Sequence, residues 1–201
     1  MDLEQPTTRR RGEALEGAIL DAAWTQLVEG GYPSFTFESV AARAGTSRPV
    51  LYRRWANREE LLIAALRKHW FSQPIEVPDT GSLRDDMIGF LSNADRARFG
   101  IATVMSVQLM QYFRDTGTSF SELRDVLRGT TQSSGVDQIV GRARERGELP
   151  AGELPPRVTT LPFDLMRHEM FMTMRQIPVS TLTEIVDEVW LPLLRQHGAK
   201  V

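Results

Sequence analysis

The sequence predicts an all-α protein of about nine helices, with an N-terminal three-helix segment followed by a longer C-terminal helical segment. Three observations lead to this fold class. Apolar residues recur at helical spacing along most of the chain, no stretch alternates as a β-strand would, and residues 72–81, which contain two prolines and a glycine, separate two helical regions. We therefore expect one domain at residues 12–71 and a second at residues 82–201.

The first two helices of the N-terminal region have clear boundaries. Residues 13–29 carry an apolar stripe and are followed by a pair of glycines, so the first helix is expected to end there. Residues 36–44 have apolar side chains at positions i, i+3, i+4 and i+7, which is typical of an amphipathic helix. Thr36 can cap the start of this helix, and Gly45 suits the left-handed residue that ends it.

A third helix is expected at residues 47–55, with Ser47 as its cap and Pro49 near its first turn. Asn57 can cap a fourth helix, which begins with two glutamates and runs to about residue 71. The glycine turn and the small residues before it allow the second and third helices to pack closely, as a helix-turn-helix requires.

The third helix has two different sides when successive residues are set roughly 100° apart. Five basic residues lie between Arg43 and Arg58, with no acidic residue among them, and Arg54 falls at the rim between the two sides. The outward side combines arginines with a tyrosine and a proline, while the inward side is apolar. The outward residues are Arg48, Pro49, Tyr52 and Arg53, and the inward residues are Val50, Leu51 and Trp55.

This stretch resembles the TetR/AcrR family of bacterial transcription regulators, and the resemblance covers roughly Gly12 to Phe71. Trp55 stands where the family usually has phenylalanine, Arg58 where it usually has lysine, and Pro49 where a small residue is common. The matching positions are Thr36, Val40, Ala41, Ala44, Gly45, Thr46, Ser47, Leu51, Tyr52, Trp55, Asn57, Arg58, Glu59 and Leu61.

The resemblance implies a helix-turn-helix that binds double-stranded DNA at a palindromic operator, most often as a homodimeric repressor in the bacterial cytoplasm, at the nucleoid. The alternative is an amphipathic surface helix whose arginines are only solvated. Phosphate contacts set the register of such a protein on DNA and base contacts set its sequence preference. By resemblance, Thr36, Tyr52 and Arg58 hold phosphates, and Ser47, Arg48, Pro49 and Arg53 lie nearest the base edges.

The C-terminal region is expected to be helical throughout. Ser82 opens it, with an aspartate three residues later as a partial capping box. Ser180 is expected to cap the last helix. The remaining helical stretches are residues 101–113, 120–127, 136–146, 155–174 and 180–196.

The last two helices carry broad apolar stripes. Such stripes can be buried within one chain, but the family resemblance implies a four-helix bundle between two chains. Pro162 and Pro192 fall inside these helices and are expected to kink them or end a segment. The expected dimer residues are Leu165, Phe171, Leu182, Ile185, Val186, Val189, Trp190 and Leu193.

A small-molecule site is implied in the second domain, again by resemblance. Methionine and aromatic side chains at helical spacing are adaptable and would suit an apolar ligand, although such residues can equally be ordinary core. The candidates are Phe90, Met105, Leu109, Met110, Phe113, Phe163, Met166 and Met170.

Several kinds of site are not expected. The chain has no cysteine, so disulfides and thiolate metal sites are excluded, and its net charge of −2 is not that of a globally basic nucleic-acid binder. The N-terminus lacks the apolar core of a signal peptide, and no apolar run reaches the length of a membrane span. We find no metal spacing, cofactor motif or catalytic constellation, so an enzyme is not expected.

Three alternatives remain open from sequence. The basic run Arg9–Arg11 is either a flexible tail or an arm that follows DNA, and His168 is most simply a hydrogen-bonded histidine. The chain could also be a family member that activates transcription or answers a protein partner. An all-helical enzyme with an incidental helix-turn-helix is the third alternative.

Overall fold

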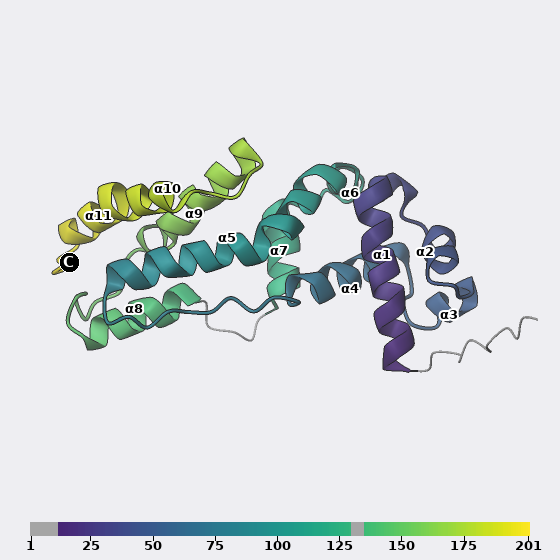
Figure 1. The fold of residues 1–201 in the computed structure, drawn as a ribbon, viewed down its shortest axis with the longest axis horizontal. Coiled ribbons are helices and arrows are strands. Elements are labelled where there is room, and N and C mark those ends of the chain that lie inside the picture. The colour runs from purple at the N-terminus through teal and green to yellow at the C-terminus, as the bar shows by residue number, and fades with distance from the viewer. Residues whose placement is uncertain (1–11, 130–134) are drawn as a thin grey trace, which may run out of the picture. The chain divides into compact units, whose positions relative to one another are not determined.

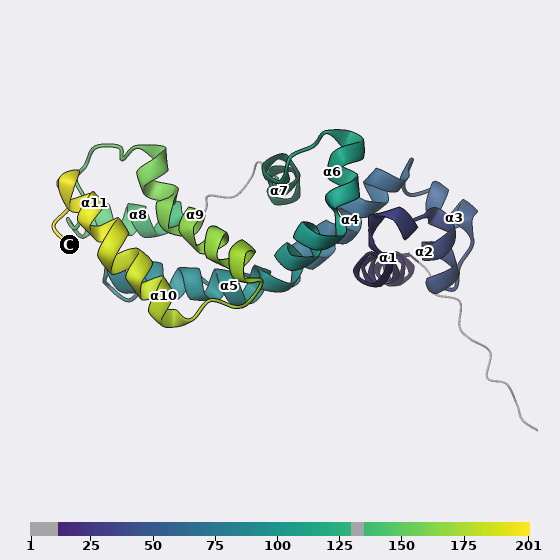
Figure 2. The same cartoon turned by 90° about the horizontal axis from the view of Figure 1, so that it is seen from above.

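The computed structural model describes residues 12–129 and 135–201, and every regular element in these ranges is a helix (Figures 1 and 2). The all-α prediction is therefore confirmed. The run Arg9–Arg11 lies outside the described residues. Within the described ranges, no helix is long and apolar enough to cross a membrane.

The chain forms two compact units. The first contains the described residues up to Phe71 together with Val107–Leu127, and the second contains Ser72–Ser106 and Arg128–Val201. These units do not coincide with the continuous ranges expected from sequence, because residues 107–127 pack with the N-terminal helices. Sequence order alone could not reveal this packing.

The first unit is organised around its first helix, α1, which contacts α2, α4 and α6. The α1 helix contains the expected break: Gly31 has φ 66° and ψ 179°, and one further turn follows it. The elements of this unit are α1 (Glu13–Ser34), α2 (Phe37–Arg43), α3 (Arg48–Tyr52), α4 (Arg58–Trp70), α6 (Met110–Thr116) and α7 (Phe120–Arg128).

The turn between α2 and α3 follows the sequence prediction in most respects. Thr36 caps α2 by accepting a hydrogen bond from the Ser39 backbone N–H at 3.1 Å, and the Ser39 hydroxyl accepts one from the Thr36 N–H in return. Gly45 has φ 62°, a left-handed conformation that glycine adopts without strain. Ser47 occupies the cap position of α3, but its side chain makes no capping hydrogen bond, so that part of the prediction is wrong.

The α3 helix is shorter than expected, because it ends at Tyr52. The chain nevertheless continues its helical direction, since the Trp55 N–H donates to the Leu51 carbonyl at 3.0 Å. The expected inward residues Val50, Leu51 and Trp55 are all buried. Their burial fixes which side of α3 faces outward.

The second unit packs three helical segments along one long helix, α5 (Figures 1 and 2). No proline occurs between residues 92 and 100, so α5 runs from Leu83 into the helix expected at residues 101–113. That expected helix is interrupted, because α5 ends at Gln108 and α6 begins at Met110. The elements of this unit are α5 (Leu83–Gln108), α8 (Gly135–Glu145), α9 (Pro156–Thr173), α10 (Val179–Glu184), the π-helix η1 (Ile185–Trp190) and α11 (Leu191–Gln196).

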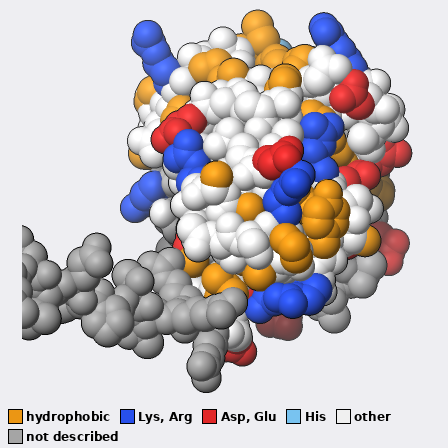
Figure 3. All heavy atoms as spheres, turned by 90° about the vertical axis from the view of Figure 1, so that its right-hand side faces the viewer, with side chains coloured by type: hydrophobic (Ala, Val, Ile, Leu, Met, Phe, Trp, Pro, Cys, Tyr) orange, Lys and Arg blue, Asp and Glu red, His pale blue; other side chains and the backbone are white. Residues whose placement is uncertain are grey.

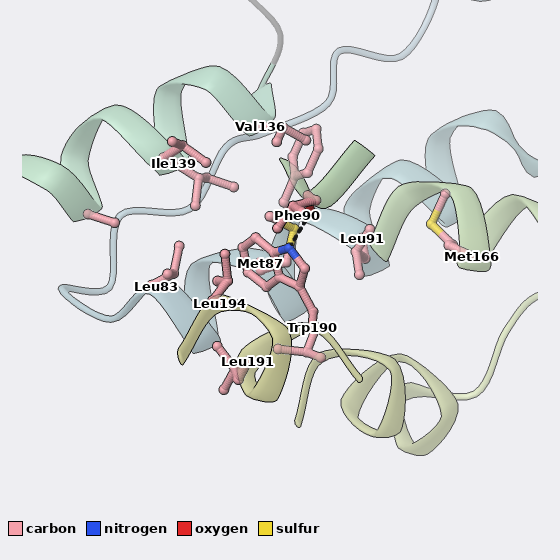
Figure 4. Packing of buried hydrophobic residues seen from close by; sticks show 14 of the residues in the cluster. Leu83, Met87, Phe90, Leu91, Val136, Ile139, Met166, Trp190, Leu191 and Leu194 are labelled. Carbon is pink, nitrogen blue, oxygen red and sulfur yellow. Dashed lines mark hydrogen bonds between the residues drawn. The ribbon is translucent and has the colours of Figure 1, made fainter. Parts of the chain in front are cut away.

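The core of this unit surrounds Trp190, which is fully buried and contributes the largest side chain (Figure 4). Its indole N–H donates to the Val158 carbonyl at 2.8 Å, so burial leaves its polar atom satisfied. Met87, Phe90 and Leu91 of α5 contribute to the same cluster. The core therefore joins all the helical segments of the unit.

The two prolines in the last helices behave differently. The α9 helix continues through Pro162, whereas Pro192 is the second residue of α11, which follows the π-helical turn. In that turn the Leu191 N–H donates to the Val186 carbonyl, five residues back. A proline ring would clash with the carbonyl four residues before it, and the wider turn is consistent with relief of that crowding. The expected cap at Ser180 is wrong, because α10 begins after Pro178 without a side-chain cap.

Candidate DNA-binding surface

The outward side of α3 is as the sequence predicted. Ser47, Arg48, Pro49, Tyr52 and Arg53 are all exposed, and Tyr52 keeps 58% of its surface accessible. An exposed tyrosine among arginines is an unusual use of a large aromatic ring, because apolar surface is normally removed from water. Its accessibility fits a contact surface.

Tyr52 is held in place from one side. Its ring packs edge-on against Phe37 of α2, with ring centroids 4.5 Å apart. Phe37 is itself buried, so the contact anchors one side of the tyrosine ring while more than half of the residue stays accessible. A side chain fixed in this way loses little conformational freedom when it binds.

A hollow of about 380 Å³ lies beside Tyr52, between α2, α3 and the start of α4. Its wall contains hydroxyl, amide and guanidinium groups, which can donate hydrogen bonds to an anion. The lining residues are Thr36, Phe37, Glu38, Arg48, Tyr52, Ala56, Asn57 and Arg58. The structure thus brings all three expected phosphate-binding residues, Thr36, Tyr52 and Arg58, to one place.

The start of α4 forms part of this wall. Asn57 accepts a hydrogen bond from the Glu60 N–H at 2.9 Å, and the Glu60 carboxylate accepts one from the Ala56 N–H at 2.8 Å. These bonds confirm the predicted cap. The helix start also carries a partial positive charge, which favours an anion nearby.

Arg58 is positioned by an aromatic contact that the sequence did not reveal. Its guanidinium carbon lies 3.9 Å from the ring centroid of Tyr32, in a cation–π arrangement. Tyr32 packs edge-on against Tyr112 of α6, and the Tyr112 hydroxyl donates to Glu59 at 2.9 Å. Burial and this hydrogen bond raise the pKa of Tyr112 to about 12, so its hydroxyl stays protonated and remains a donor.

Three of the five arginines of the motif region form ion pairs with acids elsewhere in the first unit. Arg48 donates to Glu38, Arg43 lies 2.5 Å from Glu29, and Arg54 lies 3.9 Å from Glu16. The absence of acids between residues 43 and 58 therefore does not make a purely basic surface. Figure 3 agrees, because Lys and Arg side chains on this face are scattered, with Asp and Glu beside several of them.

The eight expected ligand residues do not form one group. Phe90 and Met166 belong to the buried cluster of the second unit, with Phe163 and Met170 packed against it. Met105 is buried in the second unit as well. The other three, Leu109, Met110 and Phe113, lie in the first unit. Met110 is 51% exposed there.

The expected dimer residues also divide into two sets. Leu182, Ile185, Val186 and Trp190 are buried within the single chain, because they form the inner side of the last helical run. Phe171 and Val189 are exposed, and Leu165 and Leu193 are partly buried. An apolar stripe in the sequence cannot separate these two situations.

The histidines do not form a reactive group. His168 is exposed, and His69 stacks on Trp24 with ring centroids 4.2 Å apart. Burial lowers the pKa of His69. In the part of the chain that the structure describes, no three His, Asp or Glu side chains are grouped as metal ligands.

Two family models match the chain. Residues 19–65 match the model described as bacterial regulatory proteins, tetR family, and residues 77–189 match the model described as tetracyclin repressor-like, C-terminal domain. Together they cover the helix-turn-helix and most of the second helical region.

Relatives of known sequence agree with these matches. A DNA-binding transcriptional repressor TetR of Mycobacteroides abscessus is 30% identical over 188 residues, which cover 92% of this chain and 96% of the relative. An uncharacterised HTH-type transcriptional regulator of Mycobacterium bovis is 27% identical over 194 residues, covering 95% and 93% of the two chains.

Solved structures share the fold at low sequence identity. The flavonoid-responsive regulator FrrA has a TM-score of 0.63 at 15% identity and covers 92% of this chain and 97% of its own. The fatty acid degradation regulator FadR from Bacillus halodurans has a TM-score of 0.61 at 18% identity, covering 93% and 99%.

Proposed function

The chain belongs to the tetR family of bacterial transcription regulators, and from this premise we propose that it is a homodimeric repressor of palindromic operators that a small-molecule ligand releases from DNA. The family membership supports DNA binding in general. The roles of particular residues, the dimer and the ligand are parts of the proposal.

The outward side of α3 beside the hollow is the observation on which the proposed function rests. We infer that Thr36, Tyr52 and Arg58 hold a phosphate in the hollow, because they supply two hydroxyls and a guanidinium next to a helix start. Arg48 and Arg53 would then lie toward the base edges of the major groove. An arginine that pairs with guanine O6 and N7 contributes about 1–3 kcal/mol of discrimination.

A dimer would double the number of base pairs that are read, and its two-fold symmetry would require a palindromic site. The exposed apolar residues on α9, α10 and η1 support this proposal, since large apolar side chains left in water can mark an interface. They are Phe171, Met172, Val179 and Val189.

The proposed ligand site lies in the second unit, near Phe90, Phe163, Met166 and Met170. The rings of Phe90 and Phe163 lie 6.0 Å apart, and methionines adapt their shape to an apolar molecule. A ligand would release DNA only if it bound the non-DNA-binding conformation more tightly than the DNA-binding one.

The test is a gel shift with DNA that flanks the gene, at several salt concentrations. We expect Arg48→Ala and Tyr52→Ala to weaken binding without lowering the melting temperature. Arg157→Ala is the matched control, because Arg157 is an exposed arginine on α9 of the second unit and is not part of the α3 surface. If neither α3 variant binds more weakly than the control, the assigned surface is wrong.

A regulator that activates transcription, or that answers a protein partner, is the second candidate. A reporter gene placed behind the bound DNA separates these cases. Deleting the regulator raises expression under repression and lowers it under activation. Thermal-shift screening of small molecules then tests the ligand, since a ligand bound only by the folded state raises apparent stability.

A further inference from the structure

We propose that Glu38 determines sequence specificity by holding Arg48 in an intramolecular ion pair that weakens binding to non-cognate DNA. This inference rests on the proposed DNA-binding function and adds a regulating residue to the same surface. Neither the family motif nor the helical pattern of the sequence assigns a role to Glu38.

The pair is formed by side chains that are free to exchange partners. Glu38 lies in the first turn of α2 and Arg48 begins α3, and the Arg48 Nη1 atom donates to Glu38 Oε1. The two side chains are 68% and 55% exposed, respectively. Because water reaches both groups, the pair is weak enough for DNA to replace it.

Glu38 also faces the place where a phosphate would bind. It is the one carboxylate among the residues that line the hollow, where Arg48 and Arg58 supply the positive charges. A phosphate that takes the Arg48 Nη1 donor displaces the Glu38 carboxylate from it, and the carboxylate then remains close to the phosphate. The exchange therefore replaces one charge-assisted hydrogen bond with another and adds repulsion between like charges.

Cognate DNA can avoid this penalty, because base edges offer partners to both groups. Guanine presents the O6 and N7 acceptors to an arginine, and cytosine presents its N4 amino group to a glutamate. With such a sequence, Arg48 and Glu38 both gain partners. Non-cognate DNA offers Arg48 mainly phosphates and leaves Glu38 without a donor, so the penalty falls selectively on the wrong sequences.

The chain offers a matched control in Glu29. Its carboxylate also forms an exposed ion pair with an arginine of the same unit, Arg43, but neither residue lines the hollow. Glu38→Gln and Glu29→Gln therefore make the same change in net charge. Only Glu38→Gln removes a carboxylate from the hollow.

The experiment compares two probes by fluorescence anisotropy. One is a 30-base-pair duplex enriched from a randomised library by the wild-type protein, and the other is the unselected library. We expect Glu38→Gln to bind the unselected library about three- to tenfold more tightly, with a salt slope steeper by about 0.9 for one added phosphate contact. Because glutamine keeps a carbonyl oxygen that can accept from cytosine N4, affinity for the enriched duplex should change by less than about twofold, so the specificity ratio falls.

A double-mutant comparison identifies the partner. In an Arg48→Ala background, Glu38→Gln should change library binding no more than Glu29→Gln does, since the pair is already gone. A general charge effect would instead act equally in both backgrounds. Circular dichroism melts of each variant confirm that the fold is retained.

The outcomes separate this inference from the proposed function. The specificity ratio is the affinity for the enriched duplex divided by the affinity for the unselected library. If the wild type enriches a duplex but Glu38→Gln has the same ratio as the wild type, or the same library affinity as Glu29→Gln, the role of Glu38 is refuted and DNA binding stands. If Glu38→Gln weakens binding to both probes, Glu38 contributes to binding and the role proposed here is wrong. If the wild type binds neither probe, the proposed function and this inference fail together.

Discussion

The outward side of α3 and the core around Trp190 are stabilised by different kinds of interaction. On α3, exposed side chains are held by local contacts: the edge-on ring pair of Tyr52 with Phe37 and the ion pair of Arg48 with Glu38. Around Trp190, buried side chains from helices far apart in sequence hold one another. Substitutions in the first region should therefore change binding with little effect on folding, and substitutions in the second should do the reverse.

The largest expected effect is on the core. Trp190→Ala removes a fully buried indole and its hydrogen bond to Val158, and should lower the free energy of unfolding by about 3–5 kcal/mol. Thermal and urea melts measure the loss. Val189→Ala, one residue away and 43% exposed, should cost far less. Similar costs for the two variants would remove the contrast between core and surface.

Asp95 tests the same contrast with charge. It is buried, its Oδ2 accepts a hydrogen bond from the Ile177 N–H at 3.1 Å, and its Oδ1 has no hydrogen-bond partner among the described residues. Asp95→Asn keeps the acceptor and removes the buried charge, so at pH 7.5 it should stabilise the fold by about 1–3 kcal/mol.

The pH dependence of that gain has a definite sign. Burial raises the pKa of Asp95 in the folded state above its unfolded value of 3.8. The folded state therefore holds the proton more tightly, and the wild type is relatively most stable below the unfolded pKa and loses this stability as pH rises through the folded pKa. The free energies of unfolding of wild type and Asp95→Asn, measured by thermal melts, should be similar near pH 4 and should differ increasingly toward pH 7.5. A constant gap would rule out the buried charge as its cause.

Arg58 tests the surface side of the comparison. Arg58→Ala should weaken binding to selected and unselected DNA alike, by roughly tenfold or about 1.4 kcal/mol, because a phosphate contact carries little sequence information. The salt slope should fall by about one unit. Arg58→Lys keeps the charge but loses the planar stacking on Tyr32, so its affinity for DNA should lie between those of the wild type and Arg58→Ala. Anisotropy titrations at several salt concentrations distinguish the three proteins.

The smallest expected effect concerns Tyr112. Tyr112→Phe keeps the ring against Tyr32 but removes the hydrogen bond to Glu59. DNA affinity should fall by about two- to threefold, because a hydrogen bond of this kind contributes roughly 0.5–1.5 kcal/mol and acts on Arg58 only through Tyr32. Loss of affinity as large as that of Arg58→Ala would mean that Tyr112 has a more direct role.

The structure agrees with the sequence prediction where local rules decide the conformation. The cap at Thr36, the left-handed Gly45 and the buried side of α3 all follow from spacing within a few residues. The predicted cap at Ser47 is wrong, because a suitable residue at a cap position need not form the bond, which depends on where its hydroxyl points. The continuous α5 helix was not foreseen either, because separate apolar stretches do not show whether the turn between them is helical.

Contacts between distant residues could not be predicted in this way. The bond from Tyr112 to Glu59 joins positions 53 apart, and the pair of Arg48 and Glu38 joins two helices across a turn. A single sequence carries no signal for the first. Periodicity would have placed Glu38 on the exposed side of α2, next to α3, but not its partner. The apolar stripe of the last helices likewise did not show that Val186 faces the core while Val189 faces solvent.

The π-helical turn at Ile185–Trp190 has a consequence for how the chain could change in evolution. A strict four-residue repeat drifts by about 40° per step around an ordinary α-helix, and a wider turn absorbs part of that drift. In this chain the π-helical turn lies within a four-residue repeat of apolar side chains, all of which are fully buried: Leu182, Val186, Trp190 and Leu194. A π-turn is also what one inserted residue leaves in a helix. Deleting one residue in this turn would return it to an ordinary α-turn and leave Leu194 directed at the core, whereas the same deletion in a regular α-helix would rotate every later residue by about 100°.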